Sequence, residues 1–105
     1  MELLTKEIKT KAEKQYGKGS DMSQEVVAKF FNPMGQGTWY LMNKSPGDSY
    51  CWGIVDWMAL EVGSFDIKEL EEIELPMGMK IERDRYFKPI KAEELFKDLT
   101  KNKVH

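Results

Sequence analysis

Hydrophobic and polar positions follow a helical period near the start of this chain. Apolar side chains recur every four residues, with Lys and Glu between them, at Leu4, Ile8, Ala12 and Tyr16. This spacing predicts an amphipathic helix over residues 6–16. Thr5 is placed to cap its first turn, and the glycines that follow end it and open a polar loop over residues 17–24.

The period then changes to that of strands. Residues 26–31 are β-branched and aromatic and end at Asn32-Pro33, so they predict a first strand. A second strand is expected over 38–42, ended by the turn sequence Ser45-Pro46-Gly47-Asp48, and a third begins at Ser49 and extends toward Trp57. Strands joined by such short loops are typical of an antiparallel meander.

The rest of the chain returns to helices. A fourth strand is predicted over 60–65, interrupted by Gly63, and Asp66 is placed to cap a short helix that ends before Pro76. Residues 80–87 fit either a fifth strand or an extended loop, and 91–101 a last helix. The prediction is α+β: a small antiparallel sheet of four to five strands packed with N- and C-terminal helices and one short internal helix. One face of this sheet is expected to pack on the terminal helices, leaving the other for solvent or a partner.

Composition sets the class of protein. The 105 residues, 41% of them hydrophobic, are expected to form one domain over 1–105 with one core. No apolar run approaches the roughly 20 residues of a membrane span, and the first residues lack a signal-peptide pattern, so we expect no membrane association and a cytoplasmic location. The single Cys51 lies in an apolar run and is expected to be an inert core thiol.

Charge is unevenly distributed although the net charge is only −2. Residues 56–79 hold seven acids against Lys68 alone, whereas residues 80–105 hold eight Lys and Arg against five acids. This pattern indicates either charge pairing inside the folded domain, which we favour, or two surfaces of opposite sign for partners.

Several short motifs occur in a recognisable order along nearly the whole chain. They are Leu3-Leu4-Thr5-Lys6, Lys29-Phe30-Phe31 with Pro33, Thr38-Trp39-Tyr40, Trp52-Gly53-Ile54-Val55, Glu61-Val62-Gly63-Ser64-Phe65, Leu70, Glu82-Arg83-Asp84 and Phe87-Lys88-Pro89. Together they resemble DUF2958, a bacterial, plasmid and phage family of unknown function. The resemblance implies a setting on mobile genetic elements and implies no particular activity.

Most catalytic constellations are missing from the sequence. The only histidine is His105, which removes a Ser-His or Cys-His pair and any His-containing zinc site within the fold. Gly35-Gln36-Gly37 is a turn between strands rather than a phosphate-binding loop that opens a helix. We therefore expect no catalytic residue, no cofactor and no metal ligand, and leave enzymatic activity open with the balance against it.

One enzymatic alternative uses acids. Glu61, Glu82 and Asp84, with Asp56 nearby, would hold a metal ion in a phosphodiesterase or nuclease, and Lys29, Arg83 and Arg85 would steady a phosphate. The favoured interpretation of residues 82–85 is a solvated edge strand protected by alternating charges.

Aromatic residues support two binding hypotheses. Trp39, Tyr40, Tyr50, Trp52 and Trp57 lie on successive predicted strands, and exposed rings beside basic residues would stack the bases of a single-stranded nucleic acid. The net charge of −2 counts against this alternative.

The leading hypothesis is a non-catalytic protein-interaction module, an adaptor or inhibitor that contacts a host or mobile-element protein through an aromatic-rich sheet face. The oligomeric state is open. The candidate binding residues are Lys29, Trp39, Trp52, Glu61, Arg83 and Arg85. Gly53 and Gly63 are assigned structural roles.

Overall fold

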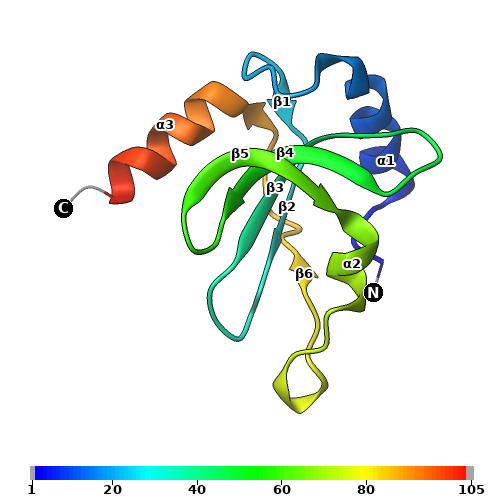
Figure 1. Cartoon of the computed structure of the whole chain (residues 1–105), viewed down its shortest axis with the longest axis vertical. Coiled ribbons are helices and arrows are strands. Elements are labelled where there is room, and N and C mark those ends of the chain that lie inside the picture. The colour runs from blue at the N-terminus through cyan, green and yellow to red at the C-terminus, as the bar shows by residue number, and fades with distance from the viewer. Residues whose placement is uncertain (1, 104–105) are drawn as a thin grey trace.

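A five-stranded antiparallel sheet forms the centre of the computed structural model, which describes residues 2–103 (Figure 1). The strands are β1 (Glu25–Val26), β2 (Ala28–Phe31), β3 (Thr38–Lys44), β4 (Tyr50–Asp56), β5 (Leu60–Asp66), β6 (Glu82–Arg83) and β7 (Ile90–Lys91). The helices are α1 (Lys6–Lys14), α2 (Ile67–Glu72) and α3 (Ala92–Lys103). The α+β prediction is confirmed, and His105 lies outside the described residues.

The sheet order is β5-β4-β3-β2-β6. Strands β2 to β5 form the predicted meander, because each short turn returns the chain beside the strand it has just left. The segment 80–87 contributes only the two residues of β6, which pairs antiparallel with β2 at the far edge from β5. The rest of that segment is loop, so the two interpretations of it were each partly right.

The predicted first strand over 26–31 is interrupted. Val26 and Glu25 pair with β7 in a separate two-stranded sheet, whereas β2 starts at Ala28 in the main sheet. Between them, the Val27 N–H donates to the Leu41 carbonyl at 2.8 Å. This pairing joins residues 25–26 to residues 90–91, which directly precede α3. No local sequence pattern predicts this contact.

The predicted helix caps are confirmed. Thr5 Oγ1 accepts from the Ile8 N–H at 3.1 Å, and Asp66 Oδ1 accepts from Lys68 and Glu69 at 2.8 and 3.3 Å. α1 ends at Lys14, slightly before its predicted end, and a 3-10 turn over Tyr16–Lys18 follows. None of the helices within residues 2–103 is long and apolar enough to cross a membrane.

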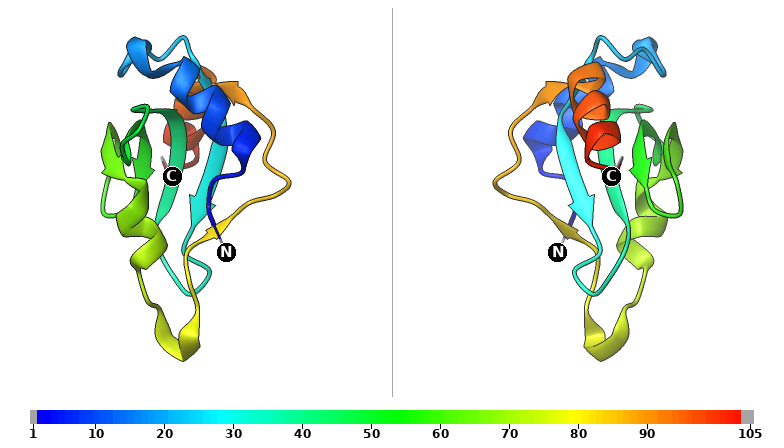
Figure 2. Two further views of the ribbon diagram at one scale, coloured as in Figure 1. Left: turned by 90° about the vertical axis from the view of Figure 1, so that its right-hand side faces the viewer. Right: turned by 90° about the vertical axis from the view of Figure 1, so that its left-hand side faces the viewer.

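The terminal helices cover opposite faces of the sheet, and this corrects the expectation that one face would stay open (Figure 2). On the face that packs on α1 and α2, the core includes Phe30, Trp39 and Leu41. On the other face, Tyr40, Met42 and Ile54 pack against the first residues of α3. Because side chains alternate along a strand, adjacent residues such as Trp39 and Tyr40 enter different cores.

Candidate binding pocket

The six candidate residues do not share one surface. Glu61 lies on β5 and Arg83 on β6, the two edges of the sheet, which four strand spacings separate by about 19 Å. Trp52 lies half-buried on the α3 face, and its ring centroid is 5.9 Å from that of Tyr50. The six candidate residues therefore do not form a single aromatic-rich face.

Trp39 is corrected from a surface residue to a core residue. It is only 7% exposed, and its ring lies 6.3 Å from the ring of Trp57, which covers it at the end of the sheet. Tyr40, on the opposite face, is 6% exposed and lies beneath Phe87. Two of the aromatic rings that would have formed an open platform are thus used to fill the two cores.

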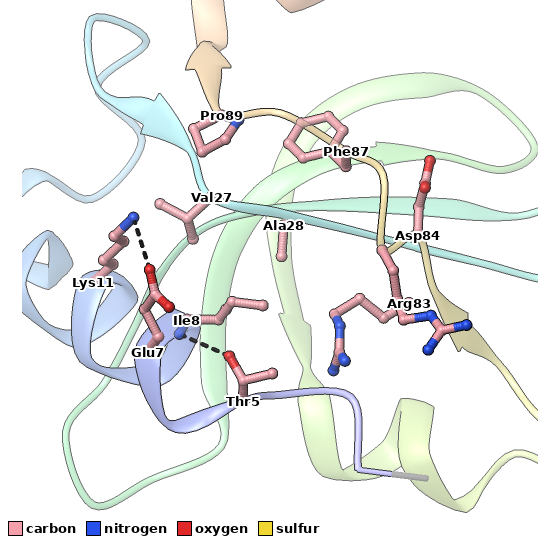
Figure 3. A pocket seen from close by; sticks show the side chains of 11 residues that line it. Thr5, Glu7, Ile8, Lys11, Val27, Ala28, Arg83, Asp84, Phe87 and Pro89 are labelled. Carbon is pink, nitrogen blue, oxygen red and sulfur yellow. Dashed lines mark hydrogen bonds and ion pairs between the residues drawn. The ribbon is translucent and has the colours of Figure 1, made fainter.

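The remaining candidates gather at the β6 edge. Here a cavity of about 400 Å³ opens between the first turns of α1 and the chain that leaves β6 (Figure 3). Its lining comes from two ends of the sequence that meet across β2: Thr5, Glu7, Ile8, Lys11, Val27, Ala28, Arg83, Asp84, Arg85, Phe87 and Pro89. We call this cavity the arginine pocket.

The floor of the arginine pocket is apolar. Ile8 comes from the inner side of α1, Val27 and Ala28 come from the start of β2, and Phe87 closes the wall beside Pro89 (Figure 3). Phe87 is held in place because its N–H donates to the Asp84 carbonyl and its ring packs on Tyr40 at 6.2 Å. A ligand here would bury apolar groups against a preformed surface.

Two of the four cations near the pocket are neutralised within the chain. Lys11 pairs with Glu7 at 3.5 Å, and Lys29 pairs with Asp84 at 3.7 Å and also lies 5.9 Å from the centre of the Tyr40 ring. Glu7 and Asp84, the two acids of the pocket lining, therefore each form an ion pair with a lysine. Lys29 itself faces away from the arginine pocket, into a neighbouring cavity of about 360 Å³ lined also by Tyr86.

The two arginines differ from these lysines. Arg83 donates from Nη1 to the carbonyl oxygens of Leu3 at 2.9 Å and Glu2 at 3.2 Å, so it anchors the chain before α1, and it forms no ion pair within residues 2–103. The exposed Arg85 side chain has no hydrogen-bond or ion-pair partner within residues 2–103. Both arginines line the arginine pocket and the neighbouring cavity.

Two hydrogen bonds hold the backbone between the arginines. The Asp84 N–H donates to the Lys29 carbonyl at 2.9 Å, and Asp84 Oδ1 accepts from the Tyr86 N–H at 2.9 Å. Both bonds involve Asp84, the residue between Arg83 and Arg85. Burial, with smaller effects from Asp56 and Asp84, raises the pKa of the Tyr40 phenol beneath this segment, so that group stays neutral at physiological pH.

The acids named for the nuclease alternative do not converge. Glu61 lies on β5 and Glu82 on β6, with three strands between them. Asp84 forms an ion pair with Lys29. Within the described part of the chain, no group of three or more acid, His or Cys side chains could hold a metal ion. The proposed metal site is therefore not supported by the geometry.

The fold is α+β, and a cavity lined by two arginines lies at one edge of its main sheet. A family model described as "Protein of unknown function (DUF2958)" matches residues 2–103, and the chain belongs to this family. No curated protein and no solved structure shows a significant match to the chain.

The sequence predicted the arginines as binding residues but not the pocket that they line. Ile8 and Phe87 were seen only as a helix position and a motif residue, because nothing in the sequence indicates that α1 and the segment after β6 meet. The one available signal was Arg83-Asp84-Arg85 followed within a few residues by Phe87 and Pro89, a basic stretch beside an apolar one.

Proposed function

We propose that this chain is a non-catalytic interaction module, an adaptor or inhibitor, that binds an acidic segment of a partner protein in the arginine pocket. One observation carries the proposal: Arg83 and Arg85 line the same cavity, and within residues 2–103 neither has a carboxylate partner, although both lysines nearby do. Planar guanidinium groups bind carboxylates with two parallel hydrogen bonds, which makes arginine the residue suited to this task.

The pocket favours an acid side chain flanked by apolar ones. Arg83 and Arg85 contribute charge to the lining, and Ile8, Val27 and Phe87 contribute apolar surface. An isolated anion would leave that apolar surface exposed, whereas a peptide would cover it and place a Glu or Asp beside the arginines. Partial burial of the charge pair would strengthen it relative to one in open water.

A second observation supports a protein partner. The β2–β3 and β4–β5 turns lie side by side and line one shallow depression. They present Met34, Trp57 and Met58, with exposed fractions of 45%, 57% and 91%. Methionine and tryptophan are side chains that contribute strongly to protein interfaces, and exposed ones in adjacent turns extend the area available for contact.

The partner in this proposal is a host protein or one encoded by a mobile genetic element, the setting implied by the resemblance to the family. Binding of single-stranded nucleic acid is the alternative that the same arginines would serve, since they also suit phosphates. The burial of Trp39 and Tyr40 removes two of the rings on which bases would stack, and this favours the protein partner.

The test replaces Arg85 rather than Arg83, because Arg83 also anchors the chain before α1. Tagged wild-type protein, Arg85→Glu and the control Lys101→Glu are each used for affinity purification from the native host, with and without nuclease. Lys101 is exposed on α3 and its replacement changes the net charge equally. The expected partner survives nuclease, is recovered with Lys101→Glu and is lost with Arg85→Glu.

A crosslinking experiment then locates the contact. A photoreactive phenylalanine replaces Tyr86, which is 88% exposed beside the arginines, and in a matched variant replaces Tyr16, which is 36% exposed next to the end of α1. Crosslinks at position 86 to an acidic segment are expected, with none at position 16. Equal recovery with Arg85→Glu, or recovery that needs nucleic acid, would reject the protein-binding proposal, and the latter would favour the nucleic-acid alternative.

A further inference from the structure

The strand β5 is an open edge of the central sheet. It is seven residues long, and β4 is its one strand partner in the described part of the chain. The opposite edge, β6, is only two residues long and has the charged sequence Glu82-Arg83. A long unpaired edge presents a row of backbone donors and acceptors that another extended chain can use.

The register shows which backbone groups point outward. The Ile67 N–H donates to the Ser49 carbonyl at 3.0 Å, and the Trp57 N–H donates to the Ala59 carbonyl at 3.3 Å. Both bonds belong to the same unbroken β4–β5 register, which pairs Gly53 with Gly63. Hydrogen-bonded and non-hydrogen-bonded pairs alternate in an antiparallel ladder, so the N–H and C=O groups of Leu60, Val62 and Ser64 point away from β4.

The side chains along this edge differ between the two faces. On the α3 face, Leu60 and Val62 are half-buried and belong to a cluster with Trp52 and the α3 residues Leu95 and Phe96. An additional strand would bury more of these apolar groups. On the α1 face, Glu61 is exposed, and a β-carbon at Gly63 would find no atom within 4 Å. That face therefore has a charge and open space.

The edge is also acidic at the end where α2 begins. Glu69 and Glu72 on α2 are exposed and outnumber the exposed Lys68 of the same helix, and like Glu61 they form no ion pair within residues 2–103. Opposite charges on neighbouring strands attract and like charges repel. The charge of this region thus selects a cationic partner over a second copy of the same strand, which would bring two Glu61-containing edges together.

We propose that β5 receives an extended, basic segment of a partner protein as a sixth strand. Lys or Arg side chains of that segment lie on the α1 face over Gly63 and beside Glu61. Its alternate residues are apolar and pack on the α3 face against Leu60 and Val62. This site is at the opposite edge from the arginine pocket and is independent of the function proposed there, so either can fail alone.

The test uses a labelled seven-residue peptide in which Lys alternates with Val, acetylated and amidated at its ends. Binding is measured by fluorescence anisotropy at low salt and followed by amide hydrogen exchange in NMR spectra. The expected signature is slowed exchange at the alternate amides of Leu60, Val62 and Ser64, whose N–H groups point outward. The Glu61 amide, already bonded to β4, is expected to change little.

Two further peptides and three protein variants serve as controls. A peptide with Glu in place of Lys, and the Lys/Val peptide with N-methylated alternate amides, are both expected not to bind. Glu61→Lys is expected to weaken binding roughly tenfold, since it turns an attraction into a repulsion, whereas Glu25→Lys on the distant β1 leaves it unchanged. Val62→Pro removes an outward N–H without touching the β4 ladder and should also reduce binding.

Other outcomes would overturn the proposal. Binding of the N-methylated peptide equal to that of its parent would show attraction by charge alone. Protection of the Leu60, Val62 and Ser64 amides in the free protein, together with a dimer in sedimentation, would show that a second copy occupies the edge. Unchanged affinity of Glu61→Lys would remove the basis for a basic partner.

Discussion

Gly53 lies so close to Tyr40 of the neighbouring strand that a β-carbon at this position would overlap the Tyr40 carbonyl oxygen. The same β-carbon would also lie 3.0 Å from the ring of Phe65. The contact is at the irregular part of the β3–β4 pairing, where the register shifts between Leu41 and Asn43. A bulge bends the strand and brings its backbone closer to the partner, which is tolerated here because glycine has no side chain.

This contact predicts very different losses of stability for alanine substitutions at two glycines that face each other. Gly53→Ala forces β3 and β4 apart and is expected to lower the free energy of unfolding by about 3 kcal/mol or more. Gly63→Ala, on the cross-strand partner, meets open space and is expected to change it by no more than about 0.5 kcal/mol. Urea unfolding of both variants measures the difference, and equal losses would contradict the overlap.

The pair of Lys44 and Glu13 predicts a cost for removing a single charge. Lys44 is 6% exposed, and its Nζ lies 3.2 Å from Glu13 Oε2 and donates to the Ser45 carbonyl at 3.0 Å. Glu13→Gln leaves an almost buried cation without its counter-charge, so a loss of about 2 kcal/mol in unfolding free energy is expected.

The exposed pair of Glu7 and Lys11 on the same helix is the control for this prediction. Glu7→Gln is expected to cost less than about 0.5 kcal/mol because water screens that pair. Adding Lys44→Met to Glu13→Gln should recover most of the lost stability, since the unpaired charge is then gone. No recovery in the double variant would show that the lysine stem, rather than the charge, carries the effect.

Cys51 predicts a stability that falls in alkaline solution. Burial raises the pKa of its thiol to about 12, against a smaller lowering by Lys44. The unfolded thiol ionises near 8.5, so between about 8.5 and 12 the folded state keeps a proton that the unfolded state releases. Stability therefore decreases as pH rises, by up to about 1.4 kcal/mol per pH unit from this group.

The variant Cys51→Ala isolates this effect, because every other ionisable group is the same in both proteins. The difference in unfolding free energy between wild type and variant is expected to shrink from pH 8 to pH 10. At pH 8 the native thiol should also react with a disulfide reagent only as fast as the protein unfolds. Rapid labelling of the native protein would contradict the raised pKa.

Asp66 predicts a pH dependence of the opposite sign. A hydrogen bond from Ser49 lowers the pKa of its carboxyl most strongly, and the backbone N–H groups of Glu69 and Lys68 add to this. A lowered folded-state pKa gives stability that is complete above the unfolded value of about 3.9 and is lost as pH falls through the folded value.

Two variants separate the cap from its charge. Asp66→Ala removes the acceptor for two N–H groups of α2 and is expected to cost about 1 kcal/mol at pH 7. Asp66→Asn keeps an acceptor, so it should cost less at pH 7 and show less loss of stability between pH 5 and pH 2 than wild type. Unfolding curves at several pH values compare them, and identical acid sensitivity would exclude the proposed role of the charge.

The sequence alone was sufficient for the elements whose signals are local. The period of four through Ile8 and Ala12 predicted α1, and the caps at Thr5 and Asp66 predicted where α1 and α2 begin. The turn at Ser45-Pro46-Gly47-Asp48 predicted the β3–β4 hairpin. Each of these depends on residues within a few positions of one another, so the pattern can be read without knowing the fold.

Tertiary structure alone decided where the candidate residues meet. The pairing of β6 with β2 separated Arg83 from Glu61, and the placement of α3 on the second face enclosed Tyr40. The arginine pocket joins residues near position 8 to residues near position 85. Such contacts are chosen by the burial of whole faces and by strand pairing across the chain, and these depend on the combined energy of many distant residues rather than on any local pattern.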